Sequence, residues 1–214
     1  MRGALQWEAT LTGDDPDQQV ADTIHLMSQY VREDSQSPSV IKDAANIASP
    51  GVDPIKAIFH HVKSLIRFQH DEVTAAWMES RLLKQALGLP VVEVLIRPQD
   101  MLTWREDTGQ HPVGDCDDYA MLTAALFQAH GIPASFVTVA ADPRAPDQFT
   151  HVYVAAYPSS GRIALDTSHG DYPGWETPNA TRKEEWPVDA GLAGWVVLGL
   201  IVLVLWVGSG RRKR

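Results

Sequence analysis

The run Gly114–Ala120 holds the only cysteine of the 214-residue chain, Cys116. A single cysteine cannot close a disulfide within the chain or supply two thiolates to a metal. Cys116 precedes an apolar pattern with helical spacing, and the N–H groups at a helix N-terminus lower the pKa of a thiol. Because the thiolate is the nucleophilic form, the sequence predicts a reactive thiolate at the start of a helix.

A histidine and an aspartate follow in the order that thiol catalysis needs. His151 begins one strand pattern, and Asp166 ends the next. Taken separately, a lone cysteine is most often a small buried hydrophobe, and an aspartate after a strand is most often a turn residue. Taken together, the order favours a nucleophile, Cys116, a base, His151, and an acid, Asp166, that orients the base.

Several motifs resemble the transglutaminase-like cysteine superfamily, in particular its short bacterial and phage branch. They are Gly-Asp-Cys-Asp-Asp at 114–118, the helix end at 129–134, Thr-His-Val-Tyr-Val at 150–154, Leu-Asp-Thr at 165–167, and the extended segment 94–98. The resemblance covers residues 53–170. It implies a papain-like core in which Cys116 is the nucleophile, His151 the base and Asp166 the orienting acid.

Four residues around the cysteine are expected to shape the site: Gly114, Asp115, Asp117 and Asp118. Carboxylates beside a thiolate raise its pKa, so their placement matters. They could point outward, as acids commonly do in a first helical turn. Alternatively, Asp117 or Asp118 binds loop N–H groups and fixes Cys116. A calcium site is the third alternative, but the run lacks the alternating ligands of an EF-hand loop, and we expect neither metal nor cofactor.

Acyl transfer also needs donors for the oxyanion that forms on the attacked carbonyl. We expect the backbone N–H of Cys116 to be one donor. The preceding loop offers Gln99, Trp104 and Gln110 as candidates for a second. His169, three residues after Asp166, is a candidate for contact with the substrate.

The order of predicted elements indicates an α+β fold, with the cysteine helix packed on an antiparallel sheet. A capping residue followed by proline predicts helix starts at Asp15, Ser37 and Asp53. We also expect a helix over 74–87, an extended segment over 91–96, a loop over 97–113, the cysteine helix up to Gly131, and strands at 134–141, 151–157 and 162–166.

Composition and patterning predict five regions. They are a mostly helical extension over 1–52, a catalytic core over 53–170, a lid-like loop and linker over 171–189, a transmembrane helix over 190–210 and a basic tail over 211–214. The net charge of −9 and the pI near 5.3 argue against nucleic acid as a partner, because its binders usually carry a basic face.

The segment Ala190–Gly210 carries no charge and has tryptophans near both ends, at Trp195 and Trp206. A membrane-spanning helix needs about 20 apolar residues, so we expect a single-pass anchor in a lipid bilayer. The basic tail Arg211–Arg214 would stay in the cytoplasm by the positive-inside rule. No apolar signal segment precedes Asp14, which slightly favours a cytoplasmic domain instead, so the side of the membrane stays open.

The sequence therefore predicts a membrane-anchored cysteine enzyme that acts on amide bonds of a protein or peptide through an acyl-thioester. Water as the second nucleophile makes it a peptidase or amidase, and an amine makes it an acyltransferase. Two alternatives are a non-catalytic transglutaminase-like scaffold in a membrane or phage-encoded assembly and a cell-wall endopeptidase. The intact set of Cys116, His151 and Asp166 argues against the scaffold.

Overall fold

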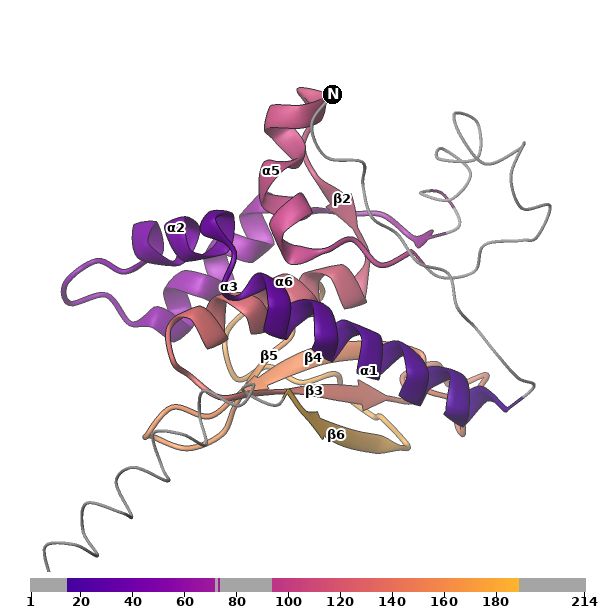
Figure 1. Cartoon of the computed structure of the whole chain (residues 1–214). Coiled ribbons are helices and arrows are strands. Elements are labelled where there is room, and N and C mark those ends of the chain that lie inside the picture. Colours follow the sequence, from indigo (N-terminus) through magenta and orange to yellow (C-terminus); the bar gives the residue numbers. More distant parts are fainter. Residues whose placement is uncertain (1–14, 72, 74–93, 189–214) are drawn as a thin grey trace, which may run out of the picture.

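The computed structural model describes residues 15–71, 73 and 94–188, and Figure 1 shows their arrangement. The helices are α1 (Pro16–Asp34), α2 (Pro38–Ile47), α3 (Pro54–Leu65), α5 (Pro98–Thr108) and α6 (Cys116–Ala129). The strands are β1 (Arg67–Phe68), β2 (Val113–Gly114), β3 (Ala134–Val139), β4 (His151–Ala156), β5 (Ile163–Leu165) and β6 (Lys183–Pro187). The fold is α+β, as predicted.

The three predicted helix starts are confirmed. The side chains of Asp15, Ser37 and Asp53 accept hydrogen bonds from first-turn N–H groups of α1, α2 and α3, and each is followed by proline. Such a cap satisfies an N–H group that a helix leaves without a partner, while proline has no N–H to lose.

The main sheet has four antiparallel strands in the order β5-β4-β3-β6. Strands β3 and β4 form its buried centre, and Val139 pairs with His151 at the end where the chain enters β4. A separate parallel pair joins β1 to β2, which places Phe68 beside Gly114, two residues before Cys116.

Helix α6 is the centre of the molecule. It packs against β3 and β4 on one side and against α1, α2, α3 and α5 on the others (Figure 1). Its residues from Asp117 to Phe127 are all buried. Two polar contacts fix its rotation: the Tyr119 hydroxyl donates to the Ile66 carbonyl at 2.6 Å, and the Thr123 and Thr167 hydroxyls lie 3.0 Å apart.

The segment 97–113, predicted as a loop, contains α5. This helix begins after Arg97 without a side-chain cap and ends at Gly109, which has the left-handed φ of 72°. It buries only Pro98, Met101 and Trp104, so its sequence lacks the wide apolar face that signals a helix.

The segment 171–189, predicted as a lid and linker, contains β6. Strand β6 pairs with β3 along Lys183–Pro187 and forms one edge of the sheet. Its charged, proline-ended sequence is typical of an edge strand, whose outer side must resist pairing with other chains. The sheet therefore extends beyond residue 170, the predicted end of the core.

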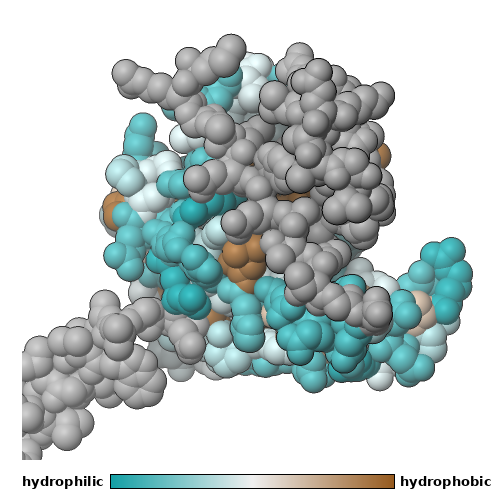
Figure 2. Space-filling view, turned by 45° about the vertical axis from the view of Figure 1, so that its right-hand side comes forward, coloured by the Kyte–Doolittle hydropathy of each residue, from teal (hydrophilic) through white to brown (hydrophobic). Residues whose placement is uncertain are grey.

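Two predicted helices, 74–87 and the membrane-spanning 190–210, lie outside the described residues. Within the part of the chain that the structure describes, no helix combines the length and the apolar character that crossing a bilayer requires. The visible face of that part is mostly hydrophilic, with small hydrophobic patches (Figure 2).

A buried ion pair joins α1 to the start of α5. The carboxylate of Asp34, at the end of α1, accepts from the Arg97 guanidinium and from the Gln99 amide N–H at 3.1 Å. Glu33 binds the same guanidinium at 2.6 Å, and the guanidinium carbon lies 4.7 Å from the centre of the Tyr30 ring. The Asp34 side chain is 2% exposed and that of Glu33 is 46% exposed.

We expect Asp34→Ala to lower the free energy of unfolding by about 3 kcal/mol, because it removes the buried partner of a mostly buried charge. Glu33→Gln is the matched control, since it removes an exposed partner of the same guanidinium, and it should cost less than about 1 kcal/mol. Urea unfolding followed by circular dichroism measures both. If both variants lost the same free energy of unfolding, burial would not determine how strongly each acid contributes to its contact with Arg97.

Candidate functional site

Cys116 is the first residue of α6 and is partly exposed. The side chain of Asp115 caps the helix by accepting from the Asp117 N–H at 3.4 Å. Because the rest of α6 is buried between the sheet and the other helices, the position of its N-terminus is fixed by packing. The structure thus holds the thiol at a rigid helix start, where the helix dipole favours an anion.

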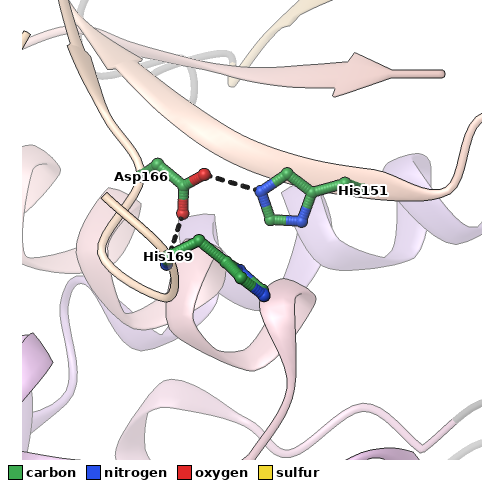
Figure 3. A group of neighbouring side chains, drawn as sticks. All are labelled: His151, Asp166 and His169. Carbon is green, nitrogen blue, oxygen red and sulfur yellow. Dashed lines mark hydrogen bonds and ion pairs between the residues drawn. The ribbon is translucent and has the colours of Figure 1, made fainter. Parts of the chain in front are cut away.

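His151 is the first residue of β4, and Asp166 directly follows β5, the neighbouring strand. The Nε2 atom of His151 lies 2.7 Å from Oδ2 of Asp166 (Figure 3). Both side chains are largely removed from water, with exposed fractions of 8% for His151 and 0% for Asp166. Adjacent strands therefore bring together the predicted base and the acid predicted to orient it.

Four donors surround the Asp166 carboxylate. Besides His151, they are the backbone N–H of His169 at 2.9 Å, the hydroxyl of Ser168 at 2.9 Å and the hydroxyl of Thr177 at 3.4 Å. Burial raises the pKa of Asp166, but the hydrogen bond and charge of His151, with the His169 amide and the Ser168 hydroxyl, outweigh burial and lower it. Asp166 is therefore ionised at neutral pH, which assigns the proton on Nε2 to His151 and leaves Nδ1 as the other ring nitrogen.

In the described part of the chain, two cavities open on the thiol, and both are lined by Asp115, Cys116, Thr150 and His151. The first, of about 350 Å³, lies between α1 and the start of β4. The second, of about 410 Å³, lies toward Phe68, His169 and Trp175. The predicted nucleophile and the predicted base thus face the same space, and that space has two arms.

His169, the predicted candidate for contact with the substrate, lines the second cavity. Its ring meets those of His151 and Phe68 edge to face, with centres 4.9 and 5.0 Å apart. Burial lowers the pKa of His169, and the charge of His151 lowers it further. The neutral form of His169 is therefore favoured at pH 7. Its Nδ1 lies 2.9 Å from the Ser168 hydroxyl.

The other three loop candidates lie away from the cavities. Trp104 is buried in the core, with 3% of its surface exposed. The backbone of Gln99 binds Asp34, and the backbone of Gln110 binds Thr108 on an exposed turn. None of the three is among the residues that line the two described cavities.

The structure buries Asp117 and Asp118, so they do not point outward. Asp118 accepts the Ile96 N–H at 2.7 Å through Oδ1, which ties the segment before α5 to the cysteine helix. Its other oxygen, Oδ2, is buried without a hydrogen-bond partner among the described residues. Burial raises the pKa of Asp118 well above its ordinary value, and the charges of Asp115 and Asp71 add to the rise.

Gly114 is required by the same carboxyl group. A Cβ atom built on Gly114 would lie 2.4 Å from Oδ2 of Asp118, which is too close for any side chain. Glycine therefore lets the chain before Cys116 run directly over the buried carboxyl.

Asp71 was not identified from the sequence, because nothing around it signals a role. It is buried, and its Oδ2 accepts the Val94 N–H at 2.5 Å. Asp71 thus anchors the segment before α5, as Asp118 does two residues later.

Among the described residues, two groups of three side chains have ligand atoms close enough for a cation, all within 4.8 Å of one another: Asp71, Asp115 and Asp117, and His151, Asp166 and His169. Hydrogen bonds already explain why several of these groups lie where they do. Asp71 binds Val94, Asp115 caps α6, and Asp166 binds His151.

One family model matches part of the chain. Residues 97–167 match the core model of the transglutaminase-like superfamily. Over this segment the chain is similar to that superfamily. The match runs from the start of α5 to the residue after Asp166, so it includes Cys116 and His151. Helices α1, α2 and α3 precede the matched core and pack against it through α6.

Other comparisons add little. No curated protein matches the chain. Among solved structures, a chain in the crystal structure of Rad4-Rad23 crosslinked to an undamaged DNA aligns with a TM-score of 0.42 and 9% identity, over 78% of this chain and 44% of that chain. The chain thus spans less than half the length of that protein, and a likeness this distant says nothing of function.

We expect Asp118→Asn to stabilise the protein at neutral pH by at least about 1 kcal/mol, the free energy of one pKa unit. The amide oxygen can keep the Ile96 hydrogen bond, and the variant has no charge to bury. A raised pKa means that the folded state holds its proton when the unfolded carboxyl, with a pKa near 3.9, has lost it. Stability of the wild type therefore falls as pH rises above about 4, and that of the variant does so less.

Urea unfolding of both proteins at pH 5 and pH 7.5 checks this expectation. The difference between them should be larger at pH 7.5. A difference that does not change with pH would mean that Asp118 is ionised in the folded state at both values. Asp118→Ala, which cannot accept from Ile96, should destabilise the protein at both.

Proposed function

We propose that this chain is a cysteine enzyme that cleaves or transfers amide bonds through an acyl-thioester, with Cys116 as nucleophile, His151 as base and Asp166 as the group that orients the base. The observation that carries the proposal is the buried hydrogen bond between His151 and Asp166 beside a cavity that Cys116 also lines. The transglutaminase-like match over 97–167 supports it, because that superfamily is commonly cysteine-based.

In the proposed reaction, Nδ1 of His151 takes the thiol proton and the Cys116 sulfur attacks the amide carbon. The C–S bond forms as the carbonyl electrons move to oxygen. When they return, the C–N bond breaks and His151 gives its proton to the leaving amine. Water or a second amine then attacks the acyl-thioester and gives a proton to His151, and the C–S bond breaks to regenerate the thiolate. Water gives hydrolysis, and an amine gives transfer.

The surroundings of Asp166 suit this role. Its lowered pKa keeps it anionic throughout, so it stabilises the imidazolium that forms on His151 without taking the proton. Its other donors, from Ser168, His169 and Thr177, keep the carboxylate in one orientation. The ring of His151 is thereby fixed as well.

For the oxyanion, we assign the backbone N–H of Cys116, which lies in the first turn of α6, where helix N–H groups face anions. The site is open enough for a protein or peptide, since its two arms meet at the thiol. A protein or peptide amide is accordingly the substrate class that we propose.

We expect iodoacetamide to alkylate Cys116 at pH 6 at least about tenfold faster than it alkylates a free thiol, whose pKa near 8.5 leaves little thiolate at that pH. His151→Ala should slow the reaction toward the free-thiol rate, because the imidazolium no longer stabilises the anion. Mass spectrometry of the full chain measures the rate, and Cys116→Ser is the control, since the chain has no other cysteine.

An ester substrate separates an enzyme from a scaffold. With p-nitrophenyl acetate, the wild type should release a burst of one equivalent of nitrophenol and carry an acetyl group on Cys116, and His151→Ala should not. A wild-type pH profile with a single transition near 8.5, unchanged in His151→Ala, would rule out catalysis by this pair and favour the non-catalytic alternative.

We also propose that residues 190–210 anchor the protein in a bilayer, on the support of their uncharged sequence and terminal tryptophans. The full chain should then sediment with membranes and resist extraction at alkaline pH. Leu200→Arg with Leu203→Arg should release it, because each arginine costs about 2.5–3.5 kcal/mol at the centre of a span. Leu200→Ile with Leu203→Ile is the control and should stay bound. A wild type extracted as readily as the arginine variant would refute the anchor.

A further inference from the structure

Helix α1 forms one wall of the 350 Å³ cavity that opens on Cys116 and His151. This helix lies outside the segment 97–167 that matches the transglutaminase-like core. The opposite wall is made by β3, by the start of β4 and by the loop before it, through Thr138, Val152 and residues 148–150.

The inner part of this cavity is apolar. Val20, Ile24 and Met27 recur at helical spacing on the face of α1 that lines it, and Val152 faces it from β4. Ile24 and Met27 are almost fully buried, at 3% and 0% exposed, so they form a fixed floor. An apolar group that enters the cavity would replace water over this floor, which is favourable.

The rim carries polar side chains without charge: Gln19, Thr23, Gln148 and Thr150. Three acids also line the cavity, at its two ends. Asp17, at the outer end, is paired with Arg182 at 2.7 Å, and the Arg182 guanidinium stacks 4.1 Å from the centre of the Phe149 ring. Asp115 and Asp117 lie at the thiol end. No Lys or Arg is among the described residues that line it, whereas three acids are, so an anionic side chain is disfavoured there.

We propose that the cavity between α1 and β4 is a subsite that receives an uncharged, apolar side chain next to the scissile carbonyl, and that Val20 and Thr23 set its size. Both residues are partly buried on the cavity face of α1. The volume lies at the lower end of the range for ligand pockets, about 300–1,000 Å³, which suits one or two side chains rather than a folded segment. The inference rests on the proposed function, because it needs Cys116 to attack that carbonyl.

The test uses the full chain and three chloromethyl ketones, made from acetyl-leucine, acetyl-glycine and acetyl-aspartate. In each, the Cys116 thiolate forms a C–S bond to the chloromethyl carbon and chloride leaves. We expect the second-order rate of Cys116 labelling, measured by mass spectrometry, to be at least tenfold higher for the leucine probe than for the glycine probe. The aspartate probe should be the slowest.

Variants that fill the cavity give the second half of the test. Thr23→Trp and Val20→Trp should each slow the leucine probe at least tenfold and change the iodoacetamide rate less than twofold. His25→Trp is the matched control, because His25 lies on the exposed side of the same helix, and it should change neither rate. Circular dichroism checks that each variant is folded. If neither tryptophan variant folds, the wild-type preference among the three probes decides alone.

The failures are distinguishable. Equal rates for the leucine and glycine probes, with fast iodoacetamide labelling of the wild type, would overturn the subsite and leave the proposed function standing. Unchanged leucine labelling in folded Thr23→Trp and Val20→Trp would do the same. Iodoacetamide labelling at the free-thiol rate would overturn the proposed function, and the subsite with it.

Discussion

The burial of α6 is the constraint on which the rest of the structure depends. A helix that is apolar on nearly every side must be covered on every side, and this one is covered by β3 and β4 below and by four helices around it. Apart from Gln128 and Ala129 at its C-terminal end, the part of α6 that is not buried is its N-terminus, where Cys116 lies partly exposed. The packing that buries α6 therefore also places Cys116 in the wall of the two cavities.

The electrostatics of the site come from two buried aspartates that behave in opposite ways. Asp166 receives four donors and its pKa falls, whereas Asp118 receives one close backbone donor beside other carboxyl groups and its pKa rises. Desolvation acts on both in the same direction, so hydrogen bonds and neighbouring charges decide the outcome. The hydrogen bond and charge of His151 lower the pKa of Asp166, whereas the charges of Asp115 and Asp71 raise that of Asp118. The charged form of Asp166 is thus favoured beside His151. The neutral form of Asp118 is favoured beneath the loop that leads to the thiol.

Local signals in the sequence were sufficient for the elements that begin at a cap. Asp15, Ser37 and Asp53 each predict a helix start from the sequence alone, because a capping hydrogen bond joins residues only two or three positions apart. The order of Cys116, His151 and Asp166 along predicted elements also indicated which side chains the fold could bring together. The geometry that joins His151 to Asp166 follows from the pairing of β4 with β5, which a strand pattern can suggest.

What the sequence could not provide depends on contacts between distant segments. Helix α5 is held by Arg97 and Asp34, which are 63 residues apart, and strand β6 forms only because β3 offers it a partner. Asp71 is held by a hydrogen bond from the Val94 N–H, 23 residues away in the sequence. Nearness in sequence to Cys116 was the only signal for Gln99, Trp104 and Gln110. In the structure the Gln99 backbone binds Asp34 and Trp104 lies in the core.

The docking of α1 has a thermodynamic consequence. The helix lines the cavity along one side, and Asp34 and Arg182 tie its two ends to distant parts of the chain. Any molecule held between α1 and β4 must then favour the state in which α1 is docked, by an amount set by its concentration relative to its dissociation constant. Detachment of this one helix is a partial opening that removes a wall of the cavity while α6 keeps its contacts with the sheet. A ligand in the cavity should therefore slow both amide exchange and proteolysis of α1, because it binds only the state in which α1 is docked.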